Sequence, residues 1–213
     1  MLARVTSYGL SGIEGYPVTV EANVSGGMPL FEIVGLPDAA VRESRERVRA
    51  ALFNSGFQMP FTRVVINLAP ADTKKIGPVY DLPIALAILC ASGQLLEEAA
   101  RGALFLGELS MGGDLSPIRG ALPAALSALR DGFTHLLLPE KNAPELSCLQ
   151  GLTVYPAASL RAAVSHLTGQ APIAPQPKAG FEALLLEHNN ANDLCHVIGQ
   201  HTAKRALEIA AAG

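Results

Sequence analysis

One carboxylate lies at the junction between a loop and a predicted buried helix. Enzymes often carry active-site residues on such loops. The carboxylate is that of Asp81, in the stretch KKIGPVYDLPIALAILCASG, where every residue from Leu82 to Ala91 is apolar. The same carboxylate suits the free N–H groups of a first helical turn and the positive end of the helix dipole. We therefore predict that Asp81 is the N-cap of a buried helix and not a catalytic acid.

Positively charged side chains in two segments are candidates for binding the phosphate backbone of DNA. One segment, LPDAAVRESRERVRAALFNSGF, carries four arginines among acids. Two of them have an acid four residues away, which is typical of a solvated helix face: Arg42 with Glu46, and Arg47 with Glu43. The other two lack such an acid, and two lysines lie in a later loop. These four cations either form a patch facing DNA or a partner or belong to solvated surfaces: Arg45, Arg49, Lys74 and Lys75.

Motifs for metal binding, nucleotide binding and nucleophilic catalysis are absent from the sequence. It contains no H-E-x-x-H and no G-x-x-x-x-G-K-[ST], so we predict no catalytic residue, metal or cofactor for this chain. Ser92 with Lys75 is a formal nucleophile–base pair, but Ser92 stands at the far end of the predicted helix. Four possible zinc ligands lie near the end of the sequence, but their spacing fits no common zinc site: His188, Cys195, His196 and His201.

The composition bounds the fold class and the partners. The 213 residues are 49% hydrophobic with only 5% aromatics, which favours α/β packing over an aromatic-rich β-sandwich. A net charge of −3 argues against a chain-wide attraction to nucleic acid but allows a local basic patch. The odd number of cysteines indicates reduced thiols. No stretch has the length of a membrane span, so we expect a cytoplasmic protein without a membrane partner.

The elements that position these residues alternate between strands and helices. YPVTVEANV and LFEIVG are predicted strands that form a hairpin around SGGMP, and RVVINLAP is a predicted central strand. A helix is predicted from an N-cap at Asp38 to Gly56, with one buried stripe of Val41, Ser44, Val48 and Leu52. GALFLGELSMGGDLSPIRG is a second hairpin. This mixture predicts an α+β fold with mixed α/β layers.

A proline-rich segment, QAPIAPQPKAG, divides the chain. We predict a domain at residues 1–168, a semi-rigid linker at 169–180 and the beginning of a further domain at 181–213. The last predicted helix, HTAKRALEIAAAG, presents an apolar face that needs a partner surface. We therefore expect the sequence to be cut from a longer protein.

Two stretches, GPVYDLPIALAIL and LFLGELSMGGDLSPIRGALPAAL, resemble the proteolytic domain of the Lon family. That domain carries its nucleophilic serine in a G-P-S-A-G loop, and a lysine shortly after a G-E-x-x-x-x-G-x-x-x-P-I motif takes the serine's proton. The serine position is Val79 here, and the lysine position is Leu122. The resemblance therefore implies a Lon-protease-like fold without peptidase activity.

Three blocks in order also resemble the ComM/YifB family, the magnesium-chelatase-like AAA+ ATPases: VGLPDAAVRESRERVRAALFNSGFQMP, INLAPADTKKIGPVYDLPIALAIL and GELSMGGDLSPIRGALPAAL. In that family a Lon-like domain precedes a AAA+ motor. DLCHVIGQHTAKRALEIAAAG resembles the segment before the Walker A loop. The turn bordering the adenine pocket is then Val197, Ile198, Gly199 and Gln200.

The family resemblance implies a role for the longer protein and two alternatives for this chain. The longer protein is expected to bind ATP and Mg²⁺, to form a hexamer through its AAA+ domain and to drive DNA branch migration in natural transformation. This chain is then an accessory domain contacting DNA or neighbouring subunits. The alternative is a protein-interaction module without a nucleic-acid role.

Overall fold

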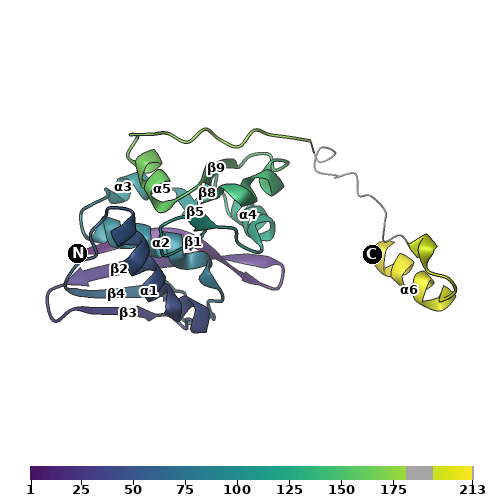
Figure 1. The fold of residues 1–213 in the computed structure, drawn as a ribbon, viewed down its shortest axis with the longest axis horizontal. Coiled ribbons are helices and arrows are strands. Elements are labelled where there is room, and N and C mark those ends of the chain that lie inside the picture. Colours follow the sequence, from purple (N-terminus) through teal and green to yellow (C-terminus); the bar gives the residue numbers. More distant parts are fainter. Residues whose placement is uncertain (181–193, 213) are drawn as a thin grey trace. The chain divides into compact units, whose positions relative to one another are not determined.

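The structure is a computed structural model that describes residues 1–180 and 194–212 of the chain (Figure 1). The chain divides into two compact units, Met1–Gly180 and Phe181–Gly213. The described part of the second unit contains a 3-10 turn at Leu194–His196 and helix α6 (His201–Ala212). No described helix is long and apolar enough to cross a membrane. The assignment of residues 1–168, 169–180 and 181–213 to domain, linker and AAA+ segment stays a prediction.

A mixed seven-stranded sheet forms the centre of the first unit, in the strand order β3-β4-β2-β1-β5-β8-β9. Its strands are β1 (Leu2–Ser11), β2 (Glu14–Ser25), β3 (Leu30–Val34), β4 (Arg63–Ala69), β5 (Ala103–Phe105), β8 (His135–Pro139) and β9 (Thr153–Ala157). β2 is antiparallel to β1 and β4, and the other neighbours are parallel. A separate hairpin joins β6 (Glu108–Leu109) to β7 (Leu115–Ser116). The predicted α+β fold with a mixed sheet is confirmed.

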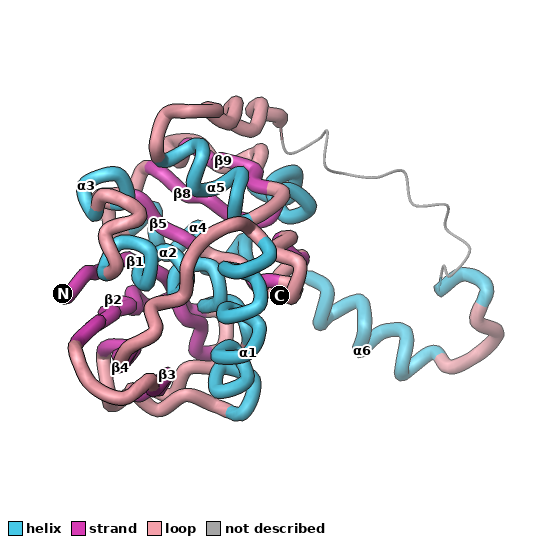
Figure 2. Tube along the Cα trace, turned by 60° about the vertical axis from the view of Figure 1, so that its left-hand side comes forward, coloured by secondary structure: helices cyan, strands magenta, loops and turns pink. Residues whose placement is uncertain are grey.

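Helices pack on the sheet (Figures 1 and 2). Their side chains contribute to two apolar clusters. The larger cluster contains residues of α1 (Ala39–Asn54), α2 (Asp81–Ala91), α3 (Glu97–Ala100) and α5 (Leu160–Leu167), whereas α4 (Ala121–Arg130) and the 3-10 segment Glu140–Leu146 contribute to the other. Strand β8 supplies both, with Leu137 in the larger cluster and Leu136 in the other, because successive strand side chains point to opposite faces.

The two predicted central helices are confirmed. In α1, the Asp38 carboxylate accepts a hydrogen bond from the backbone N–H of Val41 at 2.8 Å, as an N-cap should. The buried residues of α1 are Val41, Ser44, Val48, Ala51 and Leu52, which include the whole predicted stripe. Every residue of α2 is buried, so this helix is enclosed by the layers around it.

The predicted hairpin between the second and third strands is wrong. β4 lies between β2 and β3, and β3 runs parallel to β4. Three apolar residues of β4 are fully buried: Val64, Ile66 and Leu68. Burying this apolar surface favours a position for β4 inside the sheet, between two other strands. β3 takes the edge instead, with Leu30 and Val34 exposed. The SGGMP turn connects two strands that do not pair.

The two edges of the sheet differ in what lies beside them. At β9, the proline-rich segment returns along the strand: the N–H of Gln176 donates to the carbonyl of Val154 at 2.8 Å, and Lys178 Nζ donates to the carbonyl of Leu149 at 2.6 Å. At the opposite edge, β3 pairs only with β4 among the described residues. The open edge therefore lies next to α1.

Candidate nucleic-acid interface

The turn from β3 into α1 brings candidate cations together. Gly35 (φ 97°) and Leu36 (φ 55°) turn the backbone in left-handed conformations, and a Cβ on Gly35 would lie 2.2 Å from the carbonyl oxygen of Leu68. Only glycine fits such an approach. A later loop binds this turn, because the N–H of Lys75 donates to the carbonyl of Leu36 at 3.1 Å and the N–H of Asp38 to that of Lys75 at 3.0 Å. That loop thereby lies beside the start of α1.

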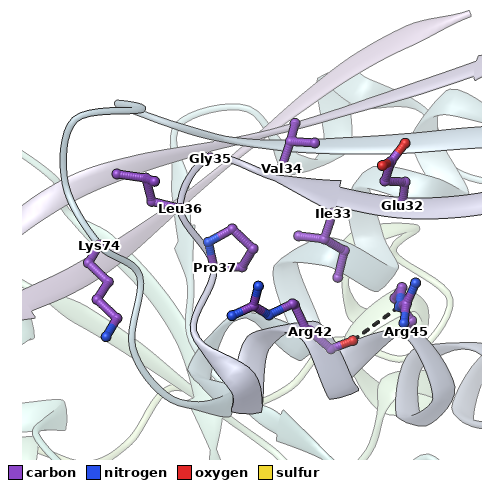
Figure 3. Close-up of a pocket in the computed structure, with 9 residues that line it drawn as sticks. All are labelled: Glu32, Ile33, Val34, Gly35, Leu36, Pro37, Arg42, Arg45 and Lys74. Atoms are coloured by element: carbon purple, nitrogen blue, oxygen red, sulfur yellow. Dashed lines mark hydrogen bonds between the residues drawn. The ribbon is translucent and has the colours of Figure 1, made fainter.

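A groove of about 650 Å³ lies between β3, this turn and α1. Figure 3 draws the nine lining residues, and we call this the α1–β3 groove. Its charged members are Arg42, Arg45, Lys74 and Glu32. Three cations and one acid leave an excess of two positive charges, in a chain whose net charge is −3. The groove therefore suits an anion that makes several contacts, such as a phosphate backbone.

Two of the four predicted cations, Arg45 and Lys74, lie together in this groove. Arg42, which the sequence assigns to a pair with Glu46, also lines it (Figure 3). Its only sequence signal is its spacing from Arg45 by three residues, which places both on one helix face. Arg49 lines two other hollows nearer the end of α1, and its guanidinium is 3.8 Å from the Glu46 carboxylate.

Lys75 is not part of a surface patch, which corrects the predicted set. Its side chain is fully buried, and Nζ donates to the carbonyls of Thr73, at 2.8 Å, and Pro70. Burial lowers the pKa of its ammonium group. Lys75 therefore organises the loop that presents Lys74. The alternative pair with Ser92 finds no support, because the Ser92 hydroxyl donates to the carbonyl of Leu89 at the end of α2.

Asp81 holds α1 against α2 instead of capping a helix, so the N-cap prediction is wrong. The N-cap position is Tyr80, without a side-chain cap bond. The fully buried Asp81 carboxylate accepts from Arg47 Nε at 2.7 Å and Nη2 at 3.1 Å, from the Ser44 hydroxyl and from the N–H of Leu109 at 3.2 Å. It faces another helix because those donors supply the partners it needs.

The charges of this pair act on each other. Burial raises the pKa of Asp81, and the hydrogen bonds from Arg47 and Ser44 work against that rise. The bond to Asp81 in turn raises the pKa of Arg47. The predicted pair of Arg47 with Glu43 is present, but the Glu43 carboxylate is mostly exposed and 3.9 Å away, whereas that of Asp81 is at 2.7 Å. The buried ion pair fixes the rotation of α1, and hence the face on which Arg42 and Arg45 stand.

The two Lon-dyad positions lie in an apolar environment. Val79 and Leu122 are both half-buried against the smaller core cluster. Val79 also lines a cavity of about 450 Å³ beside the loop before α2, with Glu108 and Arg119 among its few charged members. Neither position offers a nucleophile or a base, so their side chains cannot perform the peptidase step.

The predicted adenine-border residues lie in the second unit. Gly199 and Gln200 have positive φ values of 74° and 53°, and α6 follows directly. Ile198 is 97% exposed. Nucleotide binding by this turn stays a prediction. His188 lies outside the described residues, and the described ones contain no group of three or more His, Cys, Asp or Glu side chains able to hold a metal ion.

Comparison with known proteins matches more than half of the chain to one family model. The model describes subunit ChlI of Mg-chelatase and covers residues 20–142. Competence protein ComM of Haemophilus influenzae is 40% identical over 213 residues, which cover 100% of this chain and 42% of that protein. The YifB protein of Escherichia coli is 39% identical over 202 residues, 95% of this chain and 39% of YifB.

More distant similarity extends to peptidases. Lon protease of Rhizobium meliloti is 23% identical over 174 residues, which cover 76% of this chain and 21% of that protease. The chain spans about two fifths of the length of the ComM and YifB relatives. The similarity thus covers this chain almost completely and these longer proteins only in part.

Proposed function

The chain belongs to the ComM/YifB family of magnesium-chelatase-like proteins, and from this premise we propose that it is an accessory domain that contacts DNA. The contact is made by the α1–β3 groove through Arg42, Arg45 and Lys74. We expect these side chains to contact backbone phosphates, because contacts from Arg and Lys to phosphate oxygens position a protein on DNA without reading its sequence.

The longer protein is a AAA+ motor in this proposal. It binds ATP and Mg²⁺ through its motor domain, forms a hexamer and drives branch migration of DNA in natural transformation, in the cytoplasm. In a hexamer the groove is present in six copies, so contacts that are weak in one chain add up through multivalency. The accessory domain then holds DNA near the motor while the motor moves along it.

The single observation that carries the proposal is the gathering of cations from two distant segments. Arg42 and Arg45 come from α1, and Lys74 from a loop that backbone hydrogen bonds attach to the β3–α1 turn. Like charges repel, so three cations in one groove are stabilised when an anion binds there. A solvated helix face needs no such attachment of a second segment.

A protein-interaction module without a nucleic-acid role is the second candidate function. The open edge of β3 favours it, since an edge strand offers unpaired backbone groups to an extended peptide. Leu30 and Val34 are 44% and 40% exposed along this edge. Such a partner would bind through backbone hydrogen bonds, and its affinity would depend little on the three cations.

Charge reversal in the groove separates the two functions. We expect the triple variant Arg42→Glu/Arg45→Glu/Lys74→Glu to bind duplex DNA at least about tenfold more weakly than the wild-type chain at low salt, because three phosphate contacts become repulsive. Fluorescence anisotropy of a labelled duplex measures the dissociation constant.

A matched control changes the net charge by the same amount elsewhere. Arg101→Glu/Arg119→Glu/Lys141→Glu reverses three exposed cations outside the α1–β3 groove, and it should bind DNA within about threefold of the wild type. If both triple variants weaken binding equally, the groove has no special role. If neither variant changes binding, the protein-interaction function is favoured.

A further inference from the structure

Two phenylalanines near the end of α1 are almost fully exposed. Phe53 is 79% exposed and Phe61 is 88% exposed. Phe53 lines one hollow of about 760 Å³, and Phe61 lines another of about 540 Å³. Arg49 and Met59 line both hollows, so each ring shares a hollow with the same cation. We call Arg49, Phe53, Met59 and Phe61 the aromatic platform.

The loop that carries Phe61 is fixed to the body of the domain. The N–H of Gln58 donates to the Gln94 side-chain oxygen at 2.8 Å, and the Gln94 amide nitrogen donates to the Gln58 carbonyl at 2.8 Å. The N–H of Phe57 donates to the carbonyl of Leu52 at 2.9 Å. Held at these points, the loop presents its apolar side chains in a defined position before any ligand arrives.

The platform continues the cationic face of α1. Arg42, Arg45 and Arg49 are exposed and stand at i, i+3 and i+7, which places them along one side of a helix. Phe53 follows four residues after Arg49 and extends the same side. The buried Ser44, Val48 and Leu52 lie on the adjoining side of α1. Exposed Glu46 lies among these arginines, with its carboxylate 3.8 Å from Arg49. The exposed face of α1 therefore leads from Arg42 and Arg45 in the α1–β3 groove to Arg49 and Phe53, and Arg49 also lines the hollow of Phe61.

We infer that the aromatic platform binds single-stranded nucleic acid, with unpaired bases stacked on Phe53 and Phe61 and the phosphate between them on Arg49. The strand continues toward Arg45 and Arg42, so this inference rests on the proposed contact of the groove with phosphates. Aromatic rings beside a cationic track are the combination that binds single strands without sequence preference. Bases of an intact duplex are stacked inside it and cannot reach the rings, so the platform favours single strands.

The test compares the double variant Phe53→Ala/Phe61→Ala with the wild-type chain on oligo-dT and on a hairpin duplex. We expect oligo-dT affinity to fall on the order of tenfold or more, since each ring is lost as a stacking partner. Duplex affinity and the salt dependence of binding should stay unchanged, because no charge is altered. Both rings are exposed, so the thermal unfolding midpoint serves as a check that the fold is intact.

A matched control removes two other exposed apolar side chains. Ile13 is 85% exposed and Leu96 is 73% exposed, and neither lines the hollows at Arg49. Ile13→Ala/Leu96→Ala should bind oligo-dT like the wild type. Phe61→Trp should preserve or raise the affinity, because a larger ring stacks at least as well on a base.

Photocrosslinking locates the contact directly. Oligo-dT that contains 5-iodouracil should crosslink to Phe53 or Phe61, as identified by mass spectrometry of the digested chain. If the double variant keeps wild-type oligo-dT affinity while charge reversal in the groove weakens binding, the platform inference is wrong and the proposed function stands. If neither change affects any DNA, both are wrong. A change in self-association with unchanged DNA binding would make the platform a protein contact and overturn the inference.

Discussion

The Asp81→Ala variant should lose about 3–5 kcal/mol of the free energy of unfolding. Removing this carboxylate leaves the guanidinium of Arg47 without the two hydrogen bonds that compensate its partial burial, and it leaves the Ser44 hydroxyl in the core without its acceptor. The N–H of Leu109 loses a bond as well. Chemical denaturation followed by circular dichroism measures the change, with the midpoint falling and the slope m unchanged.

Two further variants show whether the loss comes from the buried pair. Asp38→Ala removes a helix cap and a hydrogen bond from the N–H of Gly77 at 3.1 Å, and it should cost only about 1–2 kcal/mol. The double variant Asp81→Leu/Arg47→Met replaces both charges by apolar groups of similar size and should recover most of the loss, because such replacements are often close to neutral. If Asp81→Ala lowers the free energy of unfolding no more than Asp38→Ala does, the buried ion pair contributes no more than a helix cap.

The Gly35→Ala variant should lose on the order of 3 kcal/mol or more. Gly35 has a φ of 97° and a Cβ there would lie 2.2 Å from the carbonyl oxygen of Leu68. A backbone neighbour cannot move away as a flexible side chain can, so β3 must shift from β4 and the turn beside the groove must open. Thermal and chemical unfolding measure the effect.

Gly12→Ala is the matched control for this backbone effect. Gly12 also has a positive φ, 63°, but nothing lies within 4 Å of an added Cβ. It should lose only about 1–2 kcal/mol, which is the cost of a left-handed conformation alone. Equal losses in the two variants would show that the close approach to β4 contributes nothing.

Local rules predicted the elements that depend on local interactions. The cap at Asp38, the stripe on α1 and the buried α2 follow from spacing and hydrophobicity, and all are confirmed. The order of strands depends on which surface is buried by distant partners, so the false hairpin arose from two strands that are neighbours only in sequence. The Asp81 prediction failed for the same reason, since its donors come from α1 and from Leu109 in β6, which are distant in sequence.

The cation site was predicted only in part, because the charge of a side chain does not reveal whether that side chain is exposed. A lysine in a polar loop is normally exposed, whereas Lys75 is fully buried by carbonyls of its own loop. Arg42 was passed over because an acid four residues away suggested a pair. The sequence held one usable signal for the platform: Phe53 lies outside the buried stripe of its helix, and a large apolar side chain at such a position has no core to fill.

The salt dependence of DNA binding is the most direct test of phosphate contact by the α1–β3 groove. If the α1–β3 groove contacts phosphates through three cations, they contribute about −2.7 to the slope of log K against log salt concentration on duplex DNA. The triple variant Arg42→Glu/Arg45→Glu/Lys74→Glu should then show a slope smaller in magnitude by about three units. The control Arg101→Glu/Arg119→Glu/Lys141→Glu should keep the wild-type slope. A wild-type slope near zero, or one that the groove substitutions leave unchanged, would show that the groove does not contact phosphates.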